Sequence, residues 1–157
     1  MLLVLPLCSL LLGQGAISYK HCINSATDLI QFSNNVNSGT NYSGTTVFLD
    51  ADIDLSGDLS EQFEPIGKYD TNNPFQGTFD GQGYTTSNLL MNSSSHHIGL
   101  FGFSNGATIR NVIVMDSSYS FVSSYSGLDN IRVGGIAGRC ERCAIENIVN
   151  MASVSFT

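Results

Sequence analysis

Internal repetition is the feature that most restricts how this chain can fold. Three segments share one frame, with an asparagine at the same position of each: TTSNLLM at 85–91, TIRNVIV at 108–114 and AIENIVN at 144–150. The asparagines are separated by 111 − 88 = 23 and 147 − 111 = 36 residues. A period of roughly two dozen residues with short strands is typical of a parallel β-helix, a solenoid in which each coil stacks on the previous one.

A second frame runs ahead of the first and supports the same fold. IGLFG at 98–102 matches VGGIAG at 133–138, with glycines at the positions where tight corners are expected. The longer interval is interpreted as one coil plus an insertion, and residues 117–130 are the predicted side loop. Stacked asparagine side chains can bond to one another at a coil corner, so we assign Asn88, Asn111 and Asn147 to a structural ladder.

One short helix is expected before the β region. Ser25 is a suitable N-cap, Asp28 completes a capping box, and Leu29, Phe32 and Val36 form an apolar stripe that ends before Gly39. An open solenoid end exposes unpaired strands, and this helix is well placed to cover the N-terminal one. We therefore expect three parts in the chain. Residues 1–18 are a leader segment, described below, residues 19–44 hold the helix and its lead-in, and residues 45–157 form a right-handed parallel β-helix that stops in mid-strand. The rest of the chain after Thr45 is expected to be β, and a partner or further coils are expected on the last coil.

The stretch DADIDLSGDLSE, residues 50–61, has the carboxylate spacing of a calcium-binding loop. However, the position that needs glycine is Leu55, and the lead-in TTVFL has the composition of a strand. Read at a period of two, the apolar residues face one way and Asp50, Asp52 and Asp54 the other. This pattern favours a half-buried strand. Weak binding of a cation by the three aspartates is the alternative.

Charge and composition exclude some partners. The formal net charge is −7 with only 6 Lys and Arg residues, whereas nucleic acids and anionic membranes require a basic surface. Charged residues make up 12% of the chain, so Ser, Asn, Gly and Thr supply the polar surface. This composition is typical of repetitive extracellular β structure.

The N-terminus indicates secretion. MLLVLPLCSLLLGQGAIS is apolar, too short to span a bilayer and ends in small residues, which predicts a signal peptide cleaved near Gly15 or Ser18. The alternative is a buried N-terminal strand or helix. Two sequons predict N-glycosylation at Asn41 and Asn92.

The chain has four cysteines, of which Cys8 would leave with the signal peptide. Cys140 and Cys143 could form a disulfide, a redox pair or half of a zinc site, and the absence of a second CxxC favours the disulfide. Cys22 would then be free or paired outside this chain.

The segments GTFDGQGYTTSNL, IGLFG and VGGIAGRCERCAIENIVNMASV together resemble the GLUG-motif repeats of large secreted and surface proteins, including the non-catalytic regions of IgA-peptidase-like proteins. The upstream segment from Asn24 and the EPIG tetrapeptide are similar to the stretch that leads into such repeats. The resemblance implies a β-helix in an adhesin-like or structural protein. Cys140 and Cys143 stand where the motif usually has small or polar residues, and Thr86 replaces an inward Ile.

Enzymatic activity is an alternative, because some parallel β-helices are polysaccharide lyases or hydrolases. The candidate residues are Asp50, Asp52, Asp54, Asp80 and Arg110, but Asp80 lies in a turn signature, FDGQG, and later coils lack acids in register. HExxH is absent, and His96-His97 is expected in a solvated turn. We therefore expect no catalytic, metal or cofactor site, and a partner that is a glycan or a cell-surface protein. The alternatives are a carbohydrate-active enzyme, a stalk, or an accessory region of a secreted protease.

Overall fold

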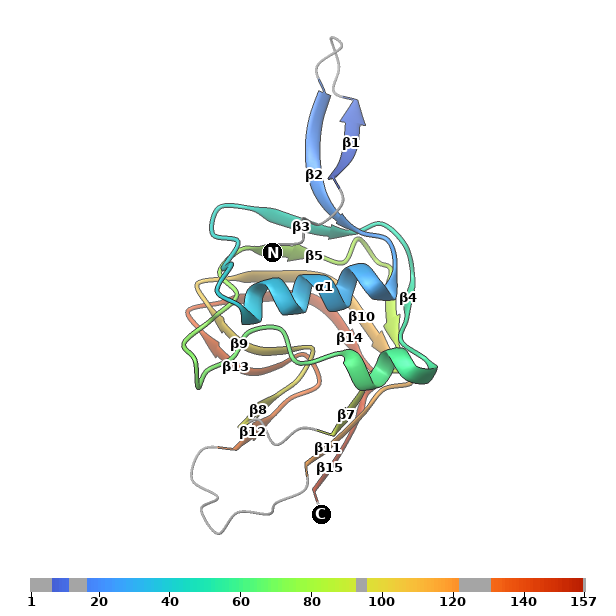
Figure 1. Ribbon diagram of the computed structural model, residues 1–157, viewed down its shortest axis with the longest axis vertical. Coiled ribbons are helices and arrows are strands. Elements are labelled where there is room, and N and C mark those ends of the chain that lie inside the picture. Colours follow the sequence, from blue (N-terminus) through green and yellow to red (C-terminus); the bar gives the residue numbers. More distant parts are fainter. Residues whose placement is uncertain (1–6, 12–16, 93–95, 122–130, 157) are drawn as a thin grey trace.

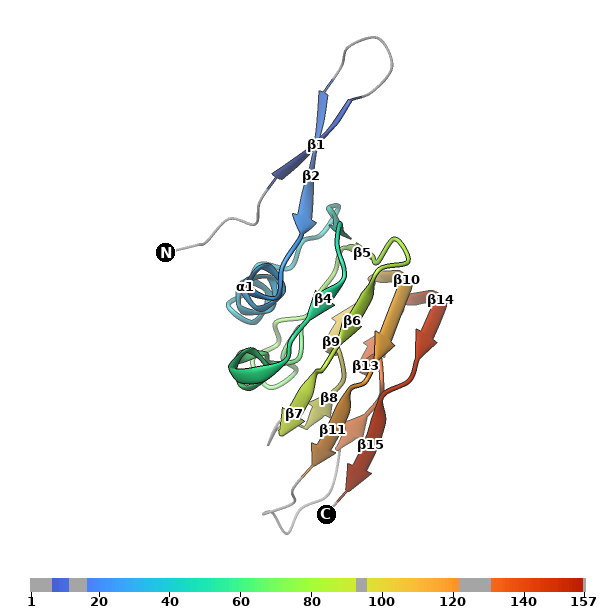
Figure 2. The same cartoon turned by 90° about the vertical axis from the view of Figure 1, so that its right-hand side faces the viewer.

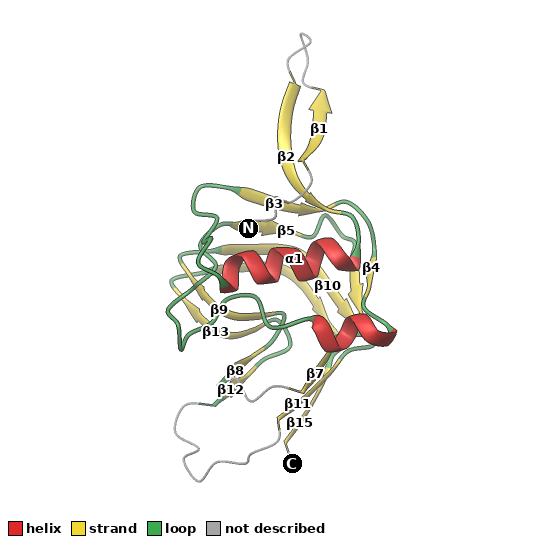
Figure 3. Cartoon of the chain, viewed as in Figure 1, coloured by secondary structure: helices red, strands yellow, loops and turns green. Residues whose placement is uncertain are grey.

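The computed structural model describes residues 7–11, 17–92, 96–121 and 131–156. Within these residues the fold is mostly β with one α-helix, and apart from the antiparallel β1–β2 pair the strands pair in parallel, as the repeats predicted. The helix, α1, spans Ala26–Asn37 (Figure 3). The strands are β1 Leu7–Leu11, β2 Ile17–Ile23, β3 Thr46–Leu49, β4 Ile53–Asp54, β5 Thr78–Asp80, β6 Thr85–Ser87, β7 Leu90–Asn92, β8 His97–Ile98, β9 Phe101–Asn105, β10 Thr108–Met115, β11 Ser118–Phe121, β12 Arg132–Val133, β13 Ala137–Glu141, β14 Ala144–Asn150 and β15 Ser153–Phe156.

Successive parts of the chain form four layers: layer 1 (46–54), layer 2 (66–92), layer 3 (97–121) and layer 4 (132–156). In layer 3, β10 pairs in parallel with β5 and β6 of layer 2 and, on its other side, with β14 of layer 4. In the same way β11 lies between β7 and β15, while β8 and β9 pair with β12 and β13. Figure 2 shows the layers in order from β4 to β14.

Apolar side chains stack along the layers because in-register strands place equivalent residues one above another. Val47, Phe79 and Ile109 are consecutive partners in layers 1 to 3, and all three are fully buried. Glycines allow the close approach of neighbouring layers. A Cβ on Gly99 would lie 2.7 Å from the carbonyl oxygen of Gly134, so the second repeated frame is a genuine contact between layers 3 and 4.

Helix α1 covers the layer 1 end of the stack (Figure 2). It begins at the expected N-cap, where the Ser25 hydroxyl accepts a hydrogen bond from the Asp28 N–H. The predicted stripe of Leu29, Phe32 and Val36 is fully buried. The Phe32 ring also contacts the ring of Phe79, at a centroid distance of 5.9 Å, which anchors the helix on the core.

The N-terminal part differs from the expected boundaries. β2 pairs in parallel with β3, so the first parallel strand precedes the helix and lies across residues assigned to the leader and the lead-in. β1 pairs antiparallel with β2, and this hairpin projects away from the layers (Figure 1). The cleavage of residues 1–18 stays a prediction.

Three further expectations were wrong in detail. The DADIDLSG strand is interrupted, because β3 ends at Leu49 and β4 spans only Ile53–Asp54, although Leu49, Ile53 and Leu55 are buried as expected. The chain then forms a short 3₁₀-helix, η2, over Gly57–Gln62, where only strands were expected. The predicted 117–130 loop begins later, because Ser118–Phe121 is β11; residues 122–130 are outside the described part.

Candidate functional site

The acid-rich segment 50–54 is bound to layer 2 by hydrogen bonds. Gln82 Nε2 donates to Asp50 Oδ1 at 2.8 Å, and the Thr85 N–H donates to Asp52 Oδ1 at 2.8 Å. Asn88 Nδ2 donates to Asp54 Oδ1, also at 2.8 Å. Each aspartate therefore accepts from a residue about one layer further along the chain, and the three carboxylates connect layers 1 and 2.

Asp80 makes the corresponding connection between layers 2 and 3. Its side chain is only slightly exposed and accepts from Arg110 Nε at 2.9 Å, Asn111 Nδ2 at 2.9 Å and the Gln82 N–H at 3.0 Å. The last of these bonds is the self-satisfied turn that FDGQG predicted. Burial opposes ionisation, but the hydrogen bonds and the Arg110 charge together lower the pKa of Asp80.

The asparagine ladder is shorter than expected. Asn147 Nδ2 donates to Asn111 Oδ1 at 2.7 Å, and both residues have the positive φ that asparagine tolerates. Asn88 belongs to a different corner, because Ser87 pairs with Met115, which aligns Asn88 with Asp116. The observed offsets are 108 − 78 = 30 and 115 − 87 = 28 between layers 2 and 3, so the 23-residue spacing does not describe a layer.

Hydrogen bonds lower the pKa of two carboxylates on this face, those of Asp52 and Asp54. A backbone hydrogen bond from Thr85 lowers the pKa of Asp52, and a hydrogen bond from the Asn88 side chain lowers that of Asp54. A general acid in glycoside hydrolysis requires a raised pKa instead. The arrangement suits stacking of layers better than proton donation.

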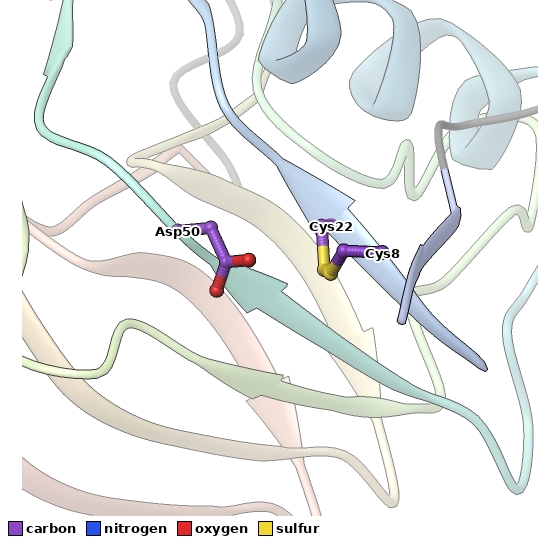
Figure 4. A group of neighbouring side chains, drawn as sticks. All are labelled: Cys8, Cys22 and Asp50. Atoms are coloured by element: carbon purple, nitrogen blue, oxygen red, sulfur yellow. A yellow bond between two sulfur atoms is a disulfide. The ribbon is translucent and has the colours of Figure 1, made fainter. Parts of the chain in front are cut away.

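Among the described residues, one group of three potential metal-ligand atoms lies within 4.8 Å of one another, namely those of Cys8, Cys22 and Asp50 (Figure 4). The two sulfurs form a disulfide in this structure, so they are not the thiolates that a metal requires. The group does not fit a metal site, and Cys22, expected to be free or paired outside the chain, is paired with Cys8.

The histidine pair is divided between surface and interior. His96 is exposed, and its Nδ1 lies 3.4 Å from Asp70 Oδ2. His97 is 4% exposed in β8 and packs against the Tyr69 ring, with no partner for Nε2, so the expectation of a solvated turn was wrong for this residue. The adjoining pocket, lined by Pro65, Gly67 and Lys68 among others, has a volume of about 20 Å³, close to that of one water molecule.

A larger recess is lined almost entirely by uncharged polar groups. Its volume is about 220 Å³, and its walls are Gly39, Asn41, Asn72, Asn73, Pro74, Gln76 and Asn105. The side-chain amides of Asn72 and Gln76 make no hydrogen bond within the described part of the chain. They supply both donors and acceptors, the combination that hydrogen-bonds hydroxyl groups. No periodic pattern marks this recess in the sequence, because its walls come from three separate segments: the α1–β3 connection, the η2–β5 connection and the end of β9.

The predicted covalent modifications have definite locations. The structure pairs Cys140 with Cys143 in a disulfide that spans the turn between β13 and β14. Asn41 is exposed, and its Oδ1 accepts from the Ser43 N–H at 3.0 Å. The Asn92 side chain and residues 93–95 lie outside the described residues. Helices long and apolar enough to cross a membrane are absent from the described part.

Comparison with known proteins gives one informative similarity. The chain is 31% identical over 149 residues to halomucin from Haloquadratum walsbyi (strain DSM 16790 / HBSQ001). The similar region covers 88% of this chain but 2% of halomucin, so the chain spans a very small part of that protein's length. No family model matches the chain, and no solved structure matches it.

Proposed function

We propose that this chain is a right-handed parallel β-helix of the GLUG-repeat type that acts outside the cell as a non-catalytic adhesive or structural module. Four layers in parallel register, with stacked core residues and a helix on the first layer, support this architecture. The Asn111–Asn147 bond agrees with the repeat frame of the sequence, and the fully buried Thr86 agrees with the inward position that the GLUG resemblance implies.

Several features support an extracellular location. The N-terminus has the composition of a signal peptide, Cys140 and Cys143 are disulfide-bonded, and the Asn41 sequon is exposed. The similarity to halomucin is a further, weak support, because the name mucin denotes secreted or surface glycoproteins.

The proposal of a non-catalytic role rests on the hydrogen bonds of the acid-rich face. Asp50, Asp52, Asp54 and Asp80 each accept from donors in the following layer. Carboxylates held in this way stabilise the stack, whereas a lyase or hydrolase needs acids that face a substrate. Purified protein should therefore release no reducing ends from polysaccharides; release that Asp80→Asn abolishes would instead favour the carbohydrate-active enzyme.

The amide-lined recess is the surface that we expect an adhesive module to use. Its free amide donors and acceptors are suited to a neutral saccharide, and its volume accommodates about one sugar unit. The test is a glycan array probed with the secreted protein, the Gln76→Ala variant and a Gln31→Ala control on α1. Binding that Gln76→Ala weakens and Gln31→Ala retains would support adhesion through the recess. Absence of glycan binding by the wild type would favour a purely structural role.

A further inference from the structure

The amide-lined recess has the acceptor residue of a glycosylation sequon in its wall. Asn41 lines the recess, is exposed, and begins the sequon Asn41-Tyr42-Ser43. Its Oδ1 accepts from the Ser43 N–H at 3.0 Å, while its Nδ2 has no partner in the described part of the chain. Nδ2 is the atom to which an N-linked sugar is attached. A glycan on Asn41 therefore starts beside the recess.

The sequon is held in place against the recess. The carbonyl oxygen of Asn41 accepts from the Gln76 N–H at 2.8 Å, which joins the sequon to a second wall residue. The Tyr42 ring packs on the ring of Phe32 at a centroid distance of 5.0 Å, and its hydroxyl accepts from Asn35 Nδ2 at 3.2 Å. The point at which a sugar would be attached is therefore fixed relative to the other walls.

The other walls offer hydrogen-bonding groups that suit a sugar, in addition to the two unpaired amides described above. Asn73 uses its Nδ2 to donate to the Asn37 carbonyl oxygen at 2.8 Å, and its Oδ1 has no donor among the described residues. Asn105 uses its Oδ1 to accept from Arg142 at 2.9 Å, and its Nδ2 has no acceptor there. Sugar hydroxyl groups both donate and accept, so they match both kinds of group.

We propose that the first sugar of an N-glycan on Asn41 occupies the amide-lined recess, so that glycosylation closes the recess to other saccharides. This inference rests on the proposed function, because it requires secretion and a recess that binds sugars. In the modification, one hydrogen of Asn41 Nδ2 leaves as a proton, and the nitrogen forms a bond to C1 of the sugar. The bond from C1 to the diphosphate of a lipid-linked oligosaccharide breaks, and the lipid diphosphate leaves with the electron pair of that bond.

An attached sugar has an advantage over a free saccharide. It is linked directly to a wall residue, so most of the freedom that a free ligand loses on binding is already lost on attachment. Copies with a modified Asn41 therefore keep their own sugar in the recess, and copies with an unmodified Asn41 bind external saccharides. Binding by the secreted wild type then comes from its unmodified copies.

Nuclear Overhauser contacts test the position of the sugar. The full chain is secreted from eukaryotic cells, and its glycans are trimmed enzymatically to the first N-acetylglucosamine. Asn92→Gln removes the second sequon, so that the remaining sugar signals come from Asn41. Protons of this sugar should contact side-chain protons of Gln76 and Asn72. A secreted chain with no sugar on Asn41, or a sugar without contact to either wall residue, would overturn the proposal.

Glycan binding tests the closure of the recess. Ser43→Ala removes the sequon but keeps Asn41 in the wall, and Ser94→Ala, which removes the other sequon, is the matched control. On a glycan array, Ser43→Ala should bind saccharides about tenfold or more tighter than the glycosylated fraction of the wild type, whereas the glycosylated Ser94→Ala variant should match that fraction. Circular dichroism checks folding, and Asn41→Gln replaces Ser43→Ala if that variant is not folded.

The two tests separate this proposal from the adhesive role. Equal binding by Ser43→Ala and the glycosylated wild type would overturn the closure of the recess. Absence of binding by every form would refute adhesion through the recess, and the contacts of the sugar would still decide whether it lies there.

Discussion

Replacement of Asn111 by leucine is expected to lower the free energy of unfolding by about 3–5 kcal/mol. The side chain donates to Asp80 and accepts from Asn147, and its backbone has a φ of 54°. The bond to the buried, ionised Asp80 contributes about 1.5–3 kcal/mol and the bond from Asn147 about 0.5–1 kcal/mol. Leucine in the left-handed conformation costs about 1 kcal/mol more. Urea denaturation followed by circular dichroism measures the sum.

Asn72 provides the matched control for the backbone contribution. It has a φ of 53°, is exposed, and its side chain makes no hydrogen bond in the described part of the chain. Asn72→Leu should therefore cost about 1 kcal/mol, and Asn111→Gly should keep most of the loss because it removes the bonds without the strain. If Asn111→Leu costs no more than Asn72→Leu, the ladder does not stabilise the stack and the reasoning fails.

Three other predictions concern the core, the buried histidine and the disulfides. Phe79→Ala should lower the free energy of unfolding in urea by about 3–5 kcal/mol, because Phe79 is fully buried against Phe32 and Phe101. Tyr84→Ala at the surface should lower it far less, and equal losses would contradict the assigned core. Burial, with the charges of Arg139 and Arg132, lowers the pKa of His97 in the folded state, so stability should be complete above the unfolded pKa of about 6.5 and fall as the pH drops below it. His97→Phe should reduce this loss between about pH 7.5 and about pH 5.5, and an unchanged pH dependence would show that His97 is not its source. Intact mass should rise by two hydrogens per disulfide on reduction, with Cys140 and Cys143 in one peptide pair, and free thiols at both would refute that pairing.

Periodicity and capping signals predicted much of the fold. The helix was correct because Ser25, Asp28 and the Leu29, Phe32 and Val36 stripe are local signals that the tertiary structure reinforces. The match between residues 98–102 and 133–138 was also confirmed, since Ile98 pairs with Val133 and Phe101 with Ala137. Tight glycine contacts leave little freedom in that register.

The errors come from features that local sequence does not determine. Asn88 was aligned with Asn111 because both precede apolar residues, yet asparagine tolerates positive φ at either corner of a layer, so two corners look alike. β2 begins inside the segment predicted as a leader, because an apolar strand and an apolar signal segment have the same composition; the cleavage itself stays a prediction. His97 was placed in solvent because a polar pair suggests a turn, whereas strand alternation turns one histidine inward.

The sequence identified the acidic residues of the candidate site but did not predict their hydrogen-bond partners. Asp50 to Asp54 were recognised as an outward acid row, but their donors, Gln82, Thr85 and Asn88, lie about 30 residues further along the chain. The amide-lined recess depends on side chains from several turns, which no spacing rule brings together. Contacts between layers therefore required the three-dimensional structure.

Nuclear Overhauser contacts in isotopically labelled protein test the stacked layers most directly. The account predicts backbone contacts of a parallel pair between Val112 and Ile148, and between Ile109 and both Phe79 and Ile145. These contacts fix the offsets of 30 and 36 residues between successive layers. Contacts of an antiparallel pattern, or a register that places Asn88 beside Asn111, would contradict it.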